Sequence, residues 1–170
     1  MEYELLIREA EIEDAAALVS FLNRVSVETD FTSLDRDGIL MTDTEMELFL
    51  DKQAHSENQI TLLALLNDEI AGLVNITADQ RKRVRHIGDL FIVIGKKYWN
   101  NGLGSFLLEE AIEWAQASGI LRRLQLTVQT RNQAAVHLYQ KHGFVIEGRQ
   151  ERGAYIEAVS YTHLRAHETG

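Results

Sequence analysis

The chain has 170 residues, the size of one ordinary domain, and a formal net charge of −9. So acidic a chain is not expected to bind nucleic acid, because phosphates need clustered Lys and Arg. The negative charge mildly favours a cationic substrate. Solubility is the commoner reason for a negative net charge. The absence of cysteine excludes disulfides, thiolate metal ligands and a cysteine nucleophile and agrees with a cytoplasmic location, and no apolar run reaches the roughly 18 residues of a membrane span.

Hydrophobic spacing divides the chain into alternating strands and helices. In chain order, strands are expected over residues 3–7, 59–66, 69–78, 87–94, 124–128, 144–151 and, less regularly, 155–164, and helices over residues 13–25, about 44–55, 105–118 and 133–142. Thr44 and Glu47 have capping-box spacing at the second helix, and Asn67-Asp68 forms a tight turn between two strands. A hairpin followed by strand–helix–strand crossovers predicts one α/β domain with a mixed sheet.

A glycine-bearing loop, Trp99-Asn100-Asn101-Gly102-Leu103-Gly104, leads from the strand at 87–94 into the helix at 105–118. Glycines let the backbone approach a ligand closely, and the free N–H groups at a helix start favour an anion such as a pyrophosphate. The hydroxyl of Ser105 is a further candidate donor. The spacing alone is equally compatible with a loop that needs two flexible residues. A Walker loop is excluded because it needs Gly-Lys-Ser/Thr, and a dinucleotide fingerprint because Leu107 stands at its third glycine.

A second patterned segment begins at Asn132 and ends at Phe144, with the sequence Asn-x-x-Ala-x-x-Leu-Tyr-x-x-x-Gly-Phe. Both segments resemble motifs of the GNAT superfamily of acyl-CoA N-acetyltransferases. The loop is similar to the superfamily pattern Gln/Arg-x-x-Gly-x-Gly/Ala, with Gly102 and Gly104 at its small positions and Trp99 where Gln or Arg is usual. The resemblance covers the chain to about residue 157.

The resemblance implies a single GNAT domain over residues 1–158 that binds acetyl-CoA as cosubstrate. Its fold would be α/β, with a mixed, mostly antiparallel sheet splayed by a bulge between the fourth and fifth strands and flanked by about four helices. The pyrophosphate would lie on the glycine loop and the pantetheine arm along the strand at 87–94. The residues implied to bind the cofactor are Phe91, Ile92, Val93, Asn101, Gly102, Leu103, Gly104, Ser105 and Asn132.

Acetyl transfer to an amine needs a proton donor and a proton acceptor. By the resemblance, Tyr139 would act as general acid on the departing CoA thiolate; the alternative is a packed aromatic with a satisfied hydroxyl. An alkylammonium with a pKa of about 10.4 must lose a proton before it attacks. Asp89 is the leading candidate base because an unpaired carboxylate within an apolar strand is costly, although local hydrogen bonding explains it equally well, and His86 is the second candidate.

Glu28, Asp30 and Phe31 lie in the polar connection between the first two helices, which by the resemblance lines the acceptor pocket. Acidic and aromatic side chains suit a cation, but a solvated loop is an equally open reading. The basic run at 81–85 is expected to be an exposed turn, with a contact to the CoA 3′-phosphate as the alternative. Residues 159–170, the last strand and tail, are expected to be partly non-native, and no metal site is expected.

The expected function is therefore N-acetyl transfer from acetyl-CoA to a primary amine by direct attack, in the cytoplasm and, by the resemblance, in a homodimer. The amine could belong to a small molecule, such as a polyamine, amino sugar or amino acid, or to a protein or peptide. The alternative is a non-catalytic, regulatory protein of GNAT fold that binds acyl-CoA. A longer acyl group is a further alternative.

Overall fold

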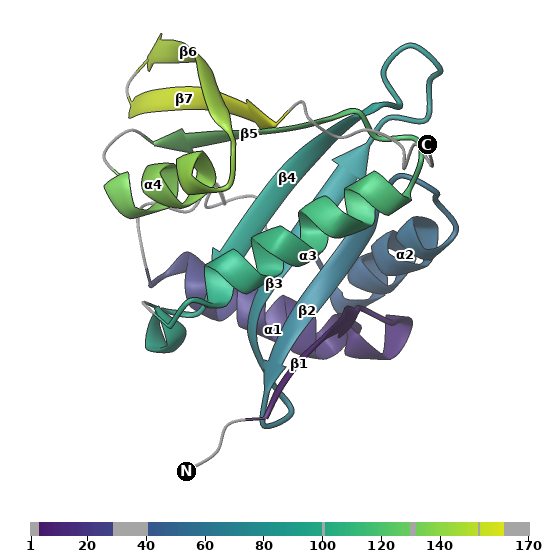
Figure 1. Cartoon of the computed structure of the whole chain (residues 1–170). Coiled ribbons are helices and arrows are strands. Elements are labelled where there is room, and N and C mark those ends of the chain that lie inside the picture. The colour runs from purple at the N-terminus through teal and green to yellow at the C-terminus, as the bar shows by residue number, and fades with distance from the viewer. Residues whose placement is uncertain (1–3, 29–40, 100, 130–131, 153, 162–170) are drawn as a thin grey trace.

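A computed structural model describes residues 4–28, 41–99, 101–129, 132–152 and 154–161 (Figure 1). The strands are β1 (Leu5–Glu9), β2 (Ile60–Leu66), β3 (Glu69–Ala78), β4 (Ile87–Ile94), β5 (Arg123–Gln129), β6 (Val145–Arg152) and β7 (Ala154–Tyr161). The helices are α1 (Ala15–Ser26), α2 (Asp43–Ala54), α3 (Leu103–Ala117) and α4 (Gln133–Lys141), with short 3-10 turns η1 (Ile12–Asp14) and η2 (Lys96–Tyr98). The strands form one sheet in the order β1-β2-β3-β4-β5-β7-β6.

The sheet opens between β4 and β5, the one parallel pair among its neighbouring strands in the described residues. Their pairing ends at Asp89↔Gln125, while β4 continues to Ile94 in its ladder with β3. Figure 1 shows β5 turning away from β4 beyond this point. The predicted mixed sheet with a splay between the fourth and fifth strands is confirmed.

The bulge expected at this splay is absent from the β3–β4 ladder, which runs without a register shift. The register shift in this part of the sheet lies instead between β2 and β3, at Ala64 and Leu65. That expectation came from the resemblance and is wrong for this pairing. The strands separate because β5 leaves β4, and β4 itself stays in register with β3.

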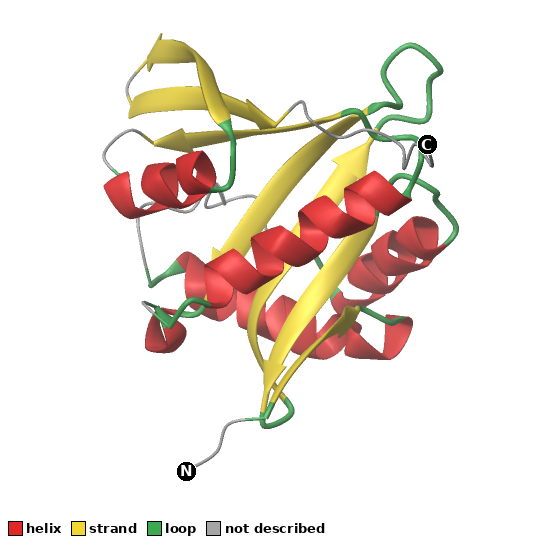
Figure 2. Ribbon diagram, in the orientation of Figure 1, coloured by secondary structure: helices red, strands yellow, loops and turns green. Residues whose placement is uncertain are grey.

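Two hydrophobic cores lie on opposite faces of the sheet, one under α3 and one under α1 and α2 (Figure 2). Side chains alternate between these faces along each strand. On β4, Leu90 and Ile92 pack in the core with α3, whereas Phe91 and Val93 pack in the core with α1 and α2. At the opening, β4 therefore directs alternate side chains to the two faces of the sheet.

Local sequence signals set the β2–β3 turn and the start of α2. Asn67 and Asp68 both adopt positive φ, as the predicted hairpin turn requires. The capping box of α2 is made by Thr42 and Glu45, where Thr44 and Glu47 were expected. The sequence Thr-Asp-Thr-Glu-Met-Glu contains two overlapping boxes, and the structure uses the earlier one because the helix begins at Asp43.

Candidate active site

The helix start after the glycine loop leaves backbone N–H groups unpaired. Gly102 precedes α3 with φ +77°, and no side chain caps the helix there. The first intrahelical bond runs from the Phe106 N–H to the Gly102 carbonyl, 3.2 Å, so the N–H groups of Leu103, Gly104 and Ser105 have no acceptor within the helix. With the helix dipole, these groups form a site for an anion.

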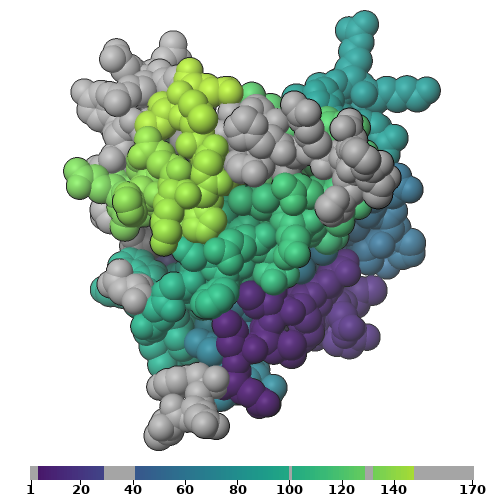
Figure 3. Space-filling view, in the orientation of Figure 1, coloured from purple at the N-terminus to yellow at the C-terminus, as the bar shows by residue number. Residues whose placement is uncertain are grey.

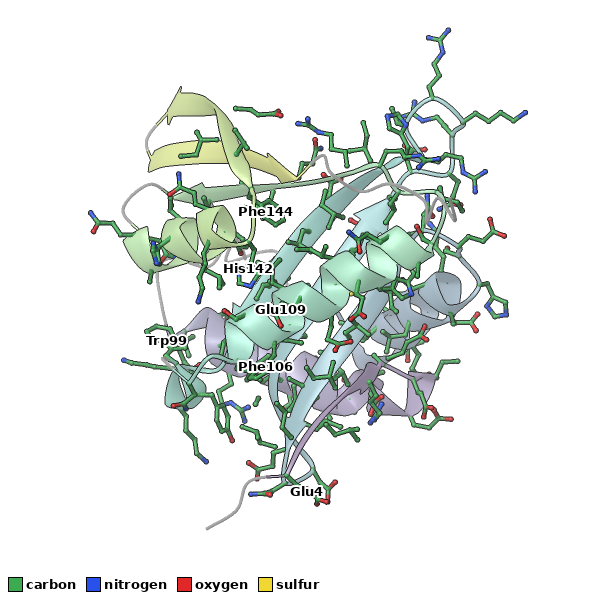
Figure 4. All side chains as sticks on the ribbon, in the orientation of Figure 1. Glu4, Trp99, Phe106, Glu109, His142 and Phe144 are labelled. Carbon is green, nitrogen blue, oxygen red and sulfur yellow. The ribbon has the colours of Figure 1, made fainter. Side chains whose placement is uncertain are left out.

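The small residue at position 104 allows α4 to approach the start of α3. A Cβ atom on Gly104 would lie 3.2 Å from a methyl carbon of Leu138 on α4. Further along the same helices, the Glu109 carboxylate lies 3.4 Å from His142 Nε2, and the His142 ring also contacts the Leu138 carbonyl, 3.0 Å. Figure 4 labels both side chains, Glu109 on α3 and His142 directly after α4. These contacts hold α4 beside the anion site.

Tyr139 lies on α4 and is buried, with 8% of its surface exposed. Its ring packs against that of Phe144, with centroids 5.6 Å apart. Burial raises the pKa of Tyr139 to about 12, so the phenol stays protonated at neutral pH. Within the part of the chain that the structure describes, the Tyr139 hydroxyl has no hydrogen-bond partner. A phenol without a partner in the chain can donate a hydrogen bond to a ligand.

The segments before and after the opening are held by side chains. Asn132 caps α4, because its Oδ1 accepts a hydrogen bond from the Ala135 N–H, 3.2 Å. The Trp99 indole N–H donates to the Ile94 carbonyl, 2.9 Å, and so ties the glycine loop to the end of β4. Trp99, which stands where Gln or Arg is usual, thus has a structural contact within the chain. Asn101 is exposed in the same loop.

The ladder of β4 shows which of its backbone groups reach the opening. The Gly95 N–H bonds to the Ala71 carbonyl of the neighbouring strand, and antiparallel pairs alternate between bonded and non-bonded. Phe91 and Val93 therefore direct their backbone groups to β3, whereas Ile92 directs its own to the opening. His86 and Ile94 belong to the same alternate set as Ile92. Their carbonyls accept hydrogen bonds from groups outside β3, as this assignment requires. Leu90, which the sequence did not single out, leaves only its carbonyl at this edge, because the parallel Asp89↔Gln125 pair uses its N–H.

Asp89 is exposed, which corrects the expectation of a carboxylate within a buried strand. Its alternation with Phe91 places it on the sheet face that carries α1 and α2, opposite to the core that contains Tyr139. The Gln125 side-chain N–H donates to Asp89 Oδ1, 2.8 Å. The environment of Asp89 is polar because β5 ends its pairing there and because α1 and α2 pack against the part of the face nearer Val93.

The Glu28 carboxylate, at the end of α1, accepts a hydrogen bond from the Lys96 N–H, 3.0 Å, so it contacts the segment between β4 and α3. Asp30 and Phe31 lie outside the described residues. His86 is half-buried before β4. The basic turn at 81–85 lies at the opposite end of β4 from the glycine loop and projects from the surface, as expected for an exposed turn (Figures 1 and 3).

Comparisons with known proteins agree on one family. The family described as Acetyltransferase (GNAT) family matches residues 26–144. The crystal structure of an acetyltransferase of GNAT family from Streptococcus pneumoniae is 79% identical, with a TM-score of 0.90, and the match covers 93% of this chain and 98% of that one. The chain belongs to the GNAT acetyltransferase family.

Two further similarities are more distant. The L-amino acid N-acetyltransferase AaaT of Escherichia coli is 32% identical over 102 residues, which is 57% of this chain and 63% of that protein. The chain thus spans less than two thirds of the length of this curated relative. The protein yncA of Salmonella typhimurium, solved with its cofactor acetyl-CoA, is 16% identical and shares the fold, with a TM-score of 0.82 over 98% of each chain.

Among the described residues, every helix is too short or too polar to span a bilayer. The same residues contain no group of three or more His, Cys, Asp or Glu that could hold a metal ion.

Proposed function

We propose that the chain transfers an acetyl group from acetyl-CoA to a primary amine by direct attack. The observation that carries the proposal is the buried Tyr139, whose hydroxyl has no partner among the described residues. A protein that only binds acyl-CoA needs no such donor, whereas a thiolate that leaves a thioester does. Membership of the GNAT family and the acetyl-CoA bound by the structurally similar yncA support the choice of cofactor.

The two substrates would meet through the opening between β4 and β5. The cofactor would enter from the side of α3 and α4, with its pyrophosphate on the N–H groups of Leu103, Gly104 and Ser105. Asn101, in the same loop, and Asn132, at the start of α4, are proposed to contact the cofactor. The amine would approach from the face that carries α1 and α2, where Asp89 and Glu28 supply negative charge.

In the proposed reaction the amine nitrogen attacks the thioester carbonyl and the carbon–sulfur bond breaks. The ammonium form first gives its proton to Asp89, directly or through water. The backbone N–H of Ile92, on the open edge of β4, would stabilise the negative charge that develops on the carbonyl oxygen. Phe91 and Val93 would support this edge through their ladder with β3, without contacting the thioester.

Tyr139 would act mainly as a hydrogen-bond donor to the departing sulfur. Its pKa of about 12 lies above the value of about 8.5 for a thiol, so complete transfer of the phenol proton is uphill. A hydrogen bond that strengthens as negative charge appears on sulfur still lowers the barrier. The effect is larger at a buried site such as that of Tyr139, where the local dielectric is lower than in water.

The test is CoA release from acetyl-CoA, followed with a thiol-reactive dye against a panel of a polyamine, an amino sugar, amino acids and a peptide N-terminus. The chain has no cysteine to react with the dye. Tyr139→Phe should lower kcat by about 100-fold, while Tyr98→Phe, the same change outside the buried site, should leave kcat near the wild-type value.

The outcomes separate the two readings of the fold. Amine-dependent release that falls only in Tyr139→Phe supports transfer and identifies the class of amine. Equal release by both variants would contradict the role of Tyr139. Acetyl-CoA binding without release by any amine would favour a regulatory protein.

A further inference from the structure

A chain of hydrogen bonds crosses the sheet at the point where β4 and β5 separate. The Gln125 amide N–H donates to Asp89 Oδ1, 2.8 Å, and the Gln125 oxygen accepts from Arg123 Nε, 3.2 Å. The Arg123 guanidinium is in turn held by both carboxylate oxygens of Glu147 on β6, at 2.9 and 2.5 Å. Four side chains from three strands are therefore linked in a fixed order.

The direction of the Gln125 amide follows from the chemistry of its neighbours. Arginine has only donors, so it must be met by the amide oxygen. An ionised carboxylate has only acceptors, so it must be met by the amide NH₂. The pair of Arg123 and Glu147 thus sets which way the amide of Gln125 points, and this excludes the flipped rotamer.

Asp89 and Gln125 form the last residue pair of the parallel ladder before the opening. The hydrogen bond uses one oxygen of Asp89, and none is found for Oδ2 among the described residues. Asp89 is exposed, so without this bond its carboxylate would turn freely between rotamers. With it, Oδ2 remains available at the edge of the opening.

We propose that Gln125 is a positioning residue, which orients the Asp89 carboxylate to accept the proton of the substrate amine. This inference rests on the proposed function, because it assigns Asp89 a part in the reaction. Gln125 itself does not exchange the proton: its amide holds Asp89 Oδ1 while Oδ2 receives the proton from the ammonium nitrogen. Loss of the bond should slow the amine-dependent step and leave acetyl-CoA binding unchanged.

The test compares Gln125→Met and Gln125→Glu with the wild type. Met keeps the length of the side chain and removes both bonds, whereas Glu keeps an acceptor for Arg123 but cannot donate to an ionised Asp89. Both should lower kcat/KM for the amine by about 10-fold with an unchanged KM for acetyl-CoA. Gln80→Met is the matched control, since Gln80 makes a similar side-chain bond, to Asn58 at 2.8 Å, in the β3–β4 turn and has no bond to Asp89 among the described residues.

The decisive measurement is the effect of Gln125→Met in an Asp89→Asn background. If Gln125 acts through Asp89, the second substitution adds little to the first. A full, additive 10-fold loss in that background, or wild-type kinetics in both Gln125 variants, would overturn the inference. Thermal unfolding of every variant shows whether any loss reflects unfolding instead.

A second readout does not depend on turnover. The Asp89 side-chain carboxyl signal in carbon NMR should move in Gln125→Met and stay in place in Gln80→Met. An unmoved signal beside an active wild type would overturn the inference and leave the proposed function standing. Absence of acetyl transfer from the wild type would overturn the proposed function, and the role of Gln125 in the reaction with it.

Discussion

Trp99 shows how one side chain can replace the usual one without loss of the loop. Its indole N–H reaches back to the Ile94 carbonyl, on the open edge of β4, and holds the start of the loop against the strand. A Gln or Arg at this position could contact a bound pyrophosphate directly. Trp99 instead restrains the loop, so its contribution to cofactor binding is expected to be indirect.

Trp99→Phe should raise the KM for acetyl-CoA by about 2- to 10-fold, the range for one lost hydrogen bond of about 0.5–1.5 kcal/mol. The KM for the amine should not change. Steady-state kinetics with acetyl-CoA as the varied substrate measure the effect. Trp114→Phe, the same substitution on α3, is the control. An equal rise of the KM for acetyl-CoA in both variants would contradict a specific role for the indole hydrogen bond of Trp99.

Residue roles differ in how far the sequence alone reveals them. Tyr139 and Gly102 lie in local patterns, and the structure packs Leu138, the neighbour of Tyr139, against Gly104 at the start of α3. The surroundings of Asp89 differ from the expectation because its neighbours along the strand are apolar, yet the side chain itself is exposed and accepts a hydrogen bond from Gln125. Gln125 was missed because its partner lies 36 residues away on a strand that only the fold brings close.

At the scale of elements, the start of α3 depends on the backbone conformation of Gly102. Its φ of +77° favours glycine, while a Cβ there would meet nothing within 4 Å. Conformation therefore explains this glycine, and crowding does not. Gly119, just beyond the end of α3, has φ +71° and equally open surroundings, so it provides a control of the same kind.

Gly102→Ala and Gly119→Ala should each cost about 1 kcal/mol of unfolding free energy, because both place a side chain in the left-handed region. Only Gly102→Ala should also raise the KM for acetyl-CoA, since only Gly102 orients the N–H groups proposed to bind the pyrophosphate. Urea unfolding and steady-state kinetics on both variants give the comparison. Equal effects on KM would show that the loop backbone is not specific to the cofactor.

The entry into α1 is held by the ion pair of Arg8 and Asp14, with contacts of 2.7 and 2.9 Å. The hydrogen bond from Arg8 is the main cause that lowers the pKa of Asp14 below 3.8. A carboxyl with a lowered folded-state pKa stabilises the fold above its unfolded pKa, and this contribution is lost as the pH falls through the folded pKa.

Asp14→Asn should therefore lower the unfolding free energy at pH 7 by about 1 kcal/mol, with allowance for solvent screening of the partly exposed Arg8. The difference from wild type should shrink below about pH 4, the unfolded-state pKa of aspartate. Thermal unfolding as a function of pH measures it. Asp79→Asn, which breaks the exposed pair with Arg81, is the control and should leave the unfolding free energy nearly unchanged. If the difference in unfolding free energy between Asp14→Asn and wild type stays constant down to low pH, the proposed link between the Asp14 pKa and stability is contradicted.

Element boundaries were predictable only where a single local signal was present. Asn67 and Asp68 are the only turn signal between the two strands, and the structure places the turn at these residues. The two overlapping capping boxes before α2 are locally equivalent, so their order depends on how α2 packs through Met46 and Leu50. Sequence spacing alone does not contain that information.

At the scale of the whole molecule, the glycine loop and the Asn132–Phe144 segment led to the correct fold because both are motifs of the family to which the chain belongs. Asn132 follows Gly104 by 28 residues in the chain, yet α4 packs on the start of α3 through Leu138 and Gly104. The division at residue 158, the cytoplasmic location and the homodimer remain predictions. So do the roles of Asp30 and Phe31, which lie outside the described residues.

The net charge of −9 leads to a prediction about the acceptor. A negative protein field raises the rate at which cationic substrates arrive, and salt screens it with a Debye length of about 10 Å at 0.1 M and about 3 Å at 1 M. The kcat/KM for an amine substrate should therefore fall as NaCl is raised, and more steeply for a diamine than for a monoamine of the same length. The kcat/KM for acetyl-CoA, itself an anion, should not fall in parallel. If the two amines instead have the same salt slope, the acidic surface contributes to solubility and not to capture of the substrate.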